Sequence, residues 1–168
     1  MWIYSSLVKS ETSATIVLAP IGTVRSSRRE RTDDDWDREE ARIELAERFP
    51  EEALDGIEEF SHAEIIFYFD RLDPATIESG ARYPRHNRAW PKVGIFVQRA
   101  SARPNRLGAT IVRVLRRTGR TLHVAGLDAI DGTPVVDIKP VLAEFLPREP
   151  VRQPEWSREL MRDYWRKQ

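Results

Sequence analysis

The chain of 168 residues contains no cysteine, only three histidines and two methionines, and no long hydrophobic run. Without cysteine it has no disulfide framework, no thiolate zinc site and no cysteine nucleophile. Three histidines are too few for a metal cluster built from histidine, and no apolar run approaches the roughly 20 residues of a membrane span. Residues 1–10 lack the cationic region and apolar core of a signal peptide. We therefore expect a cytoplasmic protein without a metal site or a membrane-spanning segment.

The length and the hydrophobic fraction of 40% predict one folded domain with one core. Residues 1–14 are polar and rich in serine and threonine, which is typical of a mobile N-terminal tail. We assign the folded domain to residues 15–147. Residues 148–168 are expected to carry a C-terminal helix that packs on the domain or on a partner chain.

The formal net charge of zero hides an uneven distribution along the chain. Residues 30–78 contain 18 acidic side chains, whereas residues 79–127 contain none and carry 11 basic ones. Such an acid-free block predicts a cationic surface for a polyanion such as nucleic acid, if its arginines converge in the fold. The alternative is that the arginines are scattered over several faces, and only the fold decides between the two.

Short segments rich in β-branched and aromatic residues predict about seven strands. They cover residues 15–25, 41–46, 63–70, 93–98, 109–117, 120–127 and 133–138. The spacing of Trp156, Leu160, Met161 and Tyr164 predicts a helix over residues 154–168. The protein is thus expected to be mainly β, a small barrel or a sandwich with long loops and a C-terminal helix. No glycine pattern of the dinucleotide-binding or P-loop type occurs.

Three clusters could carry chemistry. Ser61 and His62 are adjacent on a strand entry, so we expect opposite faces rather than a catalytic pair, with His62 a buried structural residue. The loop 99–108 is either a charged turn or a loop that presents guanidinium groups to an anionic or adenosyl ligand. Asp137 and Lys139 lie two apart on a predicted strand and form either a salt bridge or an acid–base pair.

Four motifs resemble the TrmO family, also called TsaA-like or YaeB-like. They are Pro20-Ile21-Gly22-x-Val24-Arg25-Ser26, Gly56-Ile57-x-x-Phe60-Ser61-His62, the run from Gly94-Ile95-Phe96 to Arg103-Pro104-Asn105-x-Leu107-Gly108, and Asp128-x-x-Asp131-Gly132-Thr133-Pro134-Val135-Val136-Asp137-Ile138-Lys139-Pro140. Their order and spacing extend over about three quarters of the chain.

The resemblance implies a small β-barrel, usually a homodimer, that uses S-adenosyl-L-methionine to methylate N6 of threonylcarbamoyl-adenosine 37 in a tRNA anticodon loop. It implies cofactor contacts at Phe69, Asp70, Arg99, Leu107, Leu127, Asp128, Ala129 and Ile130. RNA is read mainly in single-stranded loops, through stacking and cationic contacts. We accordingly predict RNA contacts at Arg85, His86, Arg103 and Arg106.

For the reaction we expect Asp137 to act as base or orienting group and Lys139 to tune it or to hold the threonyl carboxylate. Two other functions remain open on the sequence. One is an RNA- or nucleotide-binding barrel without catalysis, and the other is a methyltransferase for another adenosine-containing molecule.

Overall fold

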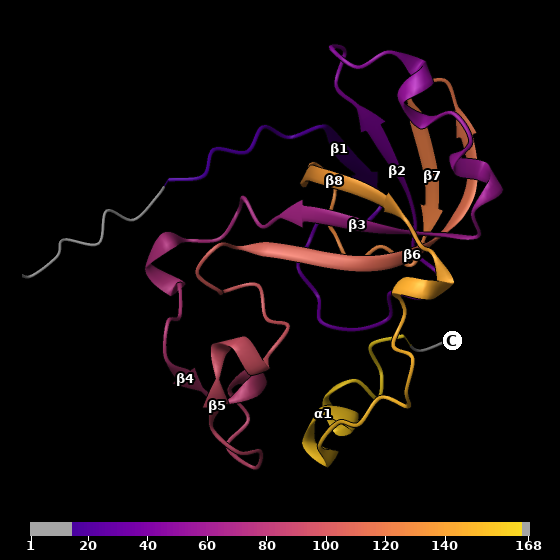
Figure 1. The fold of residues 1–168 in the computed structure, drawn as a ribbon. Helices are drawn as coiled ribbons and strands as arrows, with labels where there is room; N and C mark the ends of the chain where they lie inside the picture. The colour runs from indigo at the N-terminus through magenta and orange to yellow at the C-terminus, as the bar shows by residue number, and fades with distance from the viewer. Residues whose placement is uncertain (1–14, 166–168) are drawn as a thin grey trace, which may run out of the picture.

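The computed structural model describes residues 15–165, and six of their strands close into an antiparallel barrel (Figure 1). The order around the barrel is β1-β2-β7-β6-β3-β8, so the chain's first and last strands are neighbours. The strands are β1 (Gly22–Ser26), β2 (Glu40–Leu45), β3 (His62–Tyr68), β6 (Leu107–Thr118), β7 (Thr121–Ala125) and β8 (Pro134–Pro140). Closure pairs both edges of every barrel strand and leaves no open sheet edge. The predicted β-barrel is confirmed.

The remaining elements are small and lie outside the barrel. The strands β4 (Ala81–Arg82) and β5 (Val93–Gly94) form a separate two-stranded sheet, and one α-helix, α1 (Glu155–Leu160), follows the barrel. In Figure 1 this sheet and α1 both lie below the barrel. Short 3-10 helices make up the rest: η1 (Glu51–Leu54), η2 (Ile57–Glu59), η3 (Pro74–Thr76), η4 (Pro84–His86), η5 (Ile95–Val97) and η6 (Ala143–Phe145).

The barrel interior is filled by alternate side chains, as the two-residue period of a strand requires. On β3 the residues Ala63, Ile65 and Phe67 are buried, and the residues between them are only partly covered. At Gly108, opposite Phe67 on β6, an added Cβ would lie 2.4 Å from the Phe67 ring. Glycine at this position therefore allows the large ring to fill the barrel.

Three predicted elements differ from the observed ones. Residues 15–21 are not a strand, and β1 begins at Gly22, which lies opposite Leu45 and Val135. Residues 93–98 make one short strand and then η5, whose Ile95 is buried while Phe96 and Val97 face outward.

The C-terminal helix is shorter than predicted. It covers Glu155–Leu160 and gives way to turns at Met161, where the backbone departs from helical geometry. The predicted helix residues 166–168 and the predicted tail 1–14 lie outside the described residues.

Candidate functional site

Segments that are distant in the sequence meet at one end of the barrel, where β3 ends and β6 begins. The backbone N–H of Phe69 donates to the carbonyl of Arg106 at 2.9 Å, and the Arg99 guanidinium donates to the carbonyl of Ala109. The Arg71 guanidinium donates to the carbonyl of Asp131 at 2.8 Å. These contacts bring the end of β3, the loop 99–108 and the segment 127–132 together, as the predicted cofactor contacts require.

Asp128 lies at the centre of this cluster, on the segment that connects β7 to β8. Its carboxylate accepts hydrogen bonds from the hydroxyl of Thr110 on β6 and from the hydroxyl of Tyr164 beyond α1. Burial, and then the negative charge of Asp128, raise the pKa of Tyr164, so its hydroxyl remains a donor at neutral pH. The two donors fix the orientation of the carboxylate.

The C-terminal segment therefore contributes to the site, which the sequence reasoning missed. The N–H of Trp36 donates to the carbonyl of Tyr164 at 2.9 Å, and the indole N–H of Trp90 donates to Glu159 at 2.7 Å. These bonds dock residues 155–165 against the loop 27–39 and the segment after η4. The sequence did place Tyr164 on the apolar side of the predicted helix, which indicates that it packs against another part of the protein. Helical spacing alone, however, does not identify the residue that it contacts.

The other predicted cofactor residues supply apolar surface and one free carboxylate. Leu127 and Ala129 are buried, Leu107, Phe69 and Ile130 are partly buried, and Asp70 is exposed. The Phe69 ring packs edge-on against Phe67 with a centroid separation of 5.2 Å. The cluster thus combines carboxylates, the Arg99 guanidinium and hydrophobic surface.

The four predicted RNA contacts differ in their local partners. Arg85 forms a bidentate ion pair with Asp34, at 2.7 and 3.1 Å, so most of its charge is already neutralised. His86 is exposed, and Arg103 donates to the carbonyl of Gln98 at 3.4 Å. The guanidinium of Arg106 lies 4.6 Å from the centre of the Tyr68 ring. Of these four side chains, only Arg85 forms an ion pair with another residue between 15 and 165, so His86, Arg103 and Arg106 have no carboxylate partner there.

Asp137 and Lys139 form a salt bridge, one of the two arrangements that their spacing allowed. Both lie on the exposed side of β8, and the hydrogen bond and charge of Asp137 raise the pKa of Lys139. Within residues 15–165 their hydrogen bonds join them to each other and to the N–H of Ile138, and none reaches Asp128. Asp137 instead lines a hollow of about 560 Å³ between β8 and the η1–η2 turns.

The expectation that Ser61 and His62 cannot pair is wrong. The Ser61 Oγ lies 2.8 Å from His62 Nδ1, because β3 begins only at His62 and strand alternation does not extend back to Ser61. His62 is also only half-buried. No third group hydrogen-bonds the His62 ring in residues 15–165, so the pair lacks the orienting partner of a catalytic triad.

The described part of the chain shows no group of three or more histidine, aspartate or glutamate side chains that could hold a metal ion. In the same residues, no helix has the length and apolar character needed to cross a bilayer.

Comparison with known proteins agrees with the fold and with the arrangement of the motifs. The tRNA-methyltransferase O N-terminal domain matches residues 31–145. A probable S-adenosyl-L-methionine-binding protein of Pyrococcus abyssi is 39% identical over 143 residues, which cover 82% of this chain and 74% of the relative. The tRNA (adenine(37)-N6)-methyltransferase of Mus musculus is 41% identical over 96 residues, or 57% of this chain but 22% of that protein.

A crystal structure of TrmO from Pseudomonas aeruginosa superposes with a TM-score of 0.69 at 28% identity, covering 85% of this chain and 62% of that one. The family match covers more than half of the chain, and the relative from Pyrococcus abyssi aligns over most of both sequences. The chain therefore belongs to the TrmO family.

Proposed function

We propose that this protein transfers a methyl group from S-adenosyl-L-methionine to N6 of adenosine 37 in tRNA, with threonylcarbamoyl-adenosine as the nucleoside that it modifies. The observation that carries the proposal is the convergence around Asp128 of the end of β3, the loop 99–108 and the segment 127–130. The names of relatives support it, because they include a tRNA (adenine(37)-N6)-methyltransferase and an S-adenosyl-L-methionine-binding protein.

The side chains of this cluster fit the proposed cofactor chemically. S-Adenosyl-L-methionine has an adenine ring, ribose hydroxyls, an ammonium group and a carboxylate. Leu107, Ala129 and Ile130 supply apolar surface for a ring, and Asp128 supplies acceptors for hydroxyl or ammonium groups. The exposed Arg99 supplies a cation for the carboxylate. The bound cofactor supplies a methyl group already activated on a sulfonium.

The protein's own contribution is then mostly orientation and proton handling. Asp128, held by Thr110 and Tyr164, fixes the position of the ligand groups that it binds. We assign Asp137 as the group that accepts the proton from the adenine N6. Lys139 stays an ammonium because its pKa is raised, and it holds the threonyl carboxylate or orients Asp137.

A dimer is part of the proposal. Phe96 and Val97 on η5 are 73% and 64% exposed, and they lie just before Arg99 in the chain. A second copy that covers these side chains would border the cofactor cluster. Light scattering of the parent and of Phe96→Ser tests this, with a change from dimer to monomer as the expected result.

We also expect the protein in the cytoplasm, which cell fractionation checks.

Two measurements test the function. Calorimetry with S-adenosyl-L-methionine should show binding by the parent and weaker binding by Asp128→Asn. Mass spectrometry of tRNA nucleosides from cells with and without the gene should show one methylated adenosine that depends on it. A parent that binds tRNA but no cofactor would instead be a non-catalytic RNA-binding barrel. Cofactor binding with unchanged tRNA nucleosides would indicate a different adenosine-containing substrate.

A further inference from the structure

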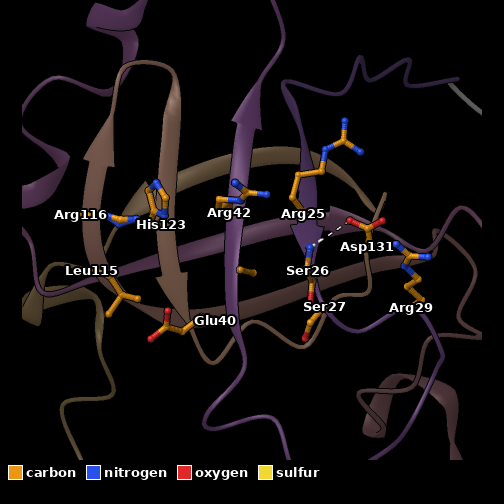
Figure 2. A pocket seen from close by; sticks show the side chains of 11 residues that line it. Arg25, Ser26, Ser27, Arg29, Glu40, Arg42, Leu115, Arg116, His123 and Asp131 are labelled. Carbon is orange, nitrogen blue, oxygen red and sulfur yellow. Dashed lines mark hydrogen bonds between the residues drawn. The ribbon is translucent and has the colours of Figure 1, made fainter.

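Three arginines and one histidine lie in one line across four neighbouring strands of the barrel. Arg25 on β1 is opposite Arg42 on β2, Arg42 is opposite His123 on β7, and His123 is opposite Arg116 on β6. Figure 2 shows these side chains in that order across the sheet. We call Arg25, Arg42, His123 and Arg116 the cationic row. None of the functional residues assigned above belongs to it.

The row is an arrangement that strand pairing by itself does not favour. Like charges directly opposite each other on a sheet destabilise it. Arg25 is compensated by an ion pair with Glu44 at 2.8 Å. The guanidinium groups of Arg42 and Arg116 make no hydrogen bond or ion pair with any residue between 15 and 165, and both side chains are exposed. Two unpaired guanidinium groups on one face are therefore free for an external anion.

The row borders a hollow large enough for several phosphate groups. The hollow has a volume of about 590 Å³ and is also lined by Arg29, while Glu40 and Asp131 are the carboxylates that line it. Strands are spaced about 4.8 Å apart, so a row across four of them extends over about 14 Å. A small ligand with a single anionic group would contact only part of a row of this length. A nucleic acid backbone, in contrast, presents phosphate charges along a line and can contact the whole row.

The pKa of His123 is also affected by the positive charge of this row. Its pKa is lowered by burial first, and then by the charges of Arg116 and Arg42, with Glu40 acting in the opposite direction. A neutral imidazole between two guanidinium groups can donate to a phosphate oxygen without adding to their repulsion. A polyanion bound across the row would raise the pKa of His123.

The hollow adjoins the candidate cofactor site. Asp131, which lines it, follows Ile130 of the predicted cofactor segment directly, and its carboxylate accepts from the N–H of Ser26 at 3.2 Å. Guanidinium groups match phosphate oxygens with paired hydrogen bonds. An RNA chain bound along the row would therefore also lie next to the segment 127–130.

We propose that the cationic row binds the phosphate backbone of the RNA substrate next to the nucleotide that is modified. The inference rests on the proposed function, because it takes the RNA to be the methyl acceptor. Arg42 and Arg116 make the direct contacts, and Arg25 remains paired with Glu44 until RNA is bound. Arg106 and His86 contact other parts of the same RNA.

The test uses the double variant Arg42→Gln with Arg116→Gln, and unmodified tRNA as the binding probe over a range of salt concentrations. We expect weaker binding and a log–log salt slope smaller by about 1.4, since each contact to a single strand contributes about 0.7. We also expect the melting temperature to stay equal or to rise, because the variant removes like-charge repulsion. Calorimetric affinity for S-adenosyl-L-methionine should stay unchanged.

The matched control is Arg148→Gln with Arg152→Gln, which removes the same charge from the exposed segment between η6 and α1. Equal losses in both double variants would show a general charge effect and overturn the proposal. Parent-like RNA binding by the row variant would overturn it while leaving the proposed function intact. A parent that binds no RNA would overturn both. In a second readout, NMR titration of His123 should give a higher pKa with tRNA bound, and an unchanged pKa would contradict the row.

Discussion

The hydrogen bond from Tyr164 to Asp128 gives the most direct test of how the C-terminal segment is held. Tyr164→Phe removes the hydroxyl and keeps the ring, which packs edge-on against Trp165 with a centroid separation of 4.9 Å. Hydrogen bonds to charged groups contribute about 1.5–3 kcal/mol. Asp128 keeps its bond from Thr110 and is only half-buried, so water can replace the lost donor.

We therefore expect the low end of that range, a loss of about 1.5 kcal/mol in the free energy of unfolding. For a chain of this size the loss corresponds to a melting temperature lower by about 3–6 °C. Urea denaturation at neutral pH measures the free energy, and thermal melting followed by circular dichroism gives the second value. Because the bond joins residues 36 positions apart, its loss should also expose the segment after α1 to limited proteolysis.

The pH dependence of the same pair has a defined sign. The folded pKa of Tyr164 is raised above its ordinary value of 10.0, mainly by burial. The contribution of this group is therefore fully present below about pH 10 and is lost as the pH rises beyond it. The parent should lose its stability advantage over Tyr164→Phe above that pH, whereas the gap should be constant at lower pH.

A double-mutant cycle with Asp128→Asn separates this contact from general effects of either substitution. The coupling between the two side chains should exceed about 0.5 kcal/mol, the limit within which independent sites add. Additive losses in the cycle, together with a gap that does not change above pH 10, would refute the assigned contact.

Four further changes have defined outcomes. Gly108→Ala places a methyl group against the Phe67 ring and should cost about 1–3 kcal/mol in urea denaturation; a parent-like midpoint would contradict the close packing. The folded pKa of His123 is lowered, so the unfolded state binds a proton more readily and the parent should lose stability below about pH 6.5. His123→Gln should remove this loss, which thermal melts from pH 5 to 8 measure. Asp137→Asn should lower kcat for tRNA methylation about 10²-fold or more with unchanged cofactor affinity, and retained methylation would exclude Asp137 as the base. Arg106→Gln should weaken tRNA binding and reduce its salt slope by about 0.7, and an unchanged slope would remove Arg106 from the interface.

The charge distribution shows how far sequence reasoning could extend. The acid-free block was evident, but the acidic segment before it folds back onto part of it. Arg85 pairs with Asp34, and Arg117 pairs with Asp55 at 2.8 Å. Arg116, the neighbour of Arg117, forms no ion pair with the described residues and belongs to the cationic row. The block is thus divided over several faces, and the row takes Arg25 and Arg42 from outside it.

The sequence by itself determined the barrel strands, because alternation such as that of Ala63, Ile65 and Phe67 depends only on local order and hydrophobicity. Its motifs also identified the segments that meet around Asp128. Only the tertiary structure decided that Tyr164 reaches Asp128, that Ser61 contacts His62, and which arginines lack a partner. These outcomes depend on barrel closure and strand register, which bring side chains together from positions far apart in the sequence. No local pattern contains that information.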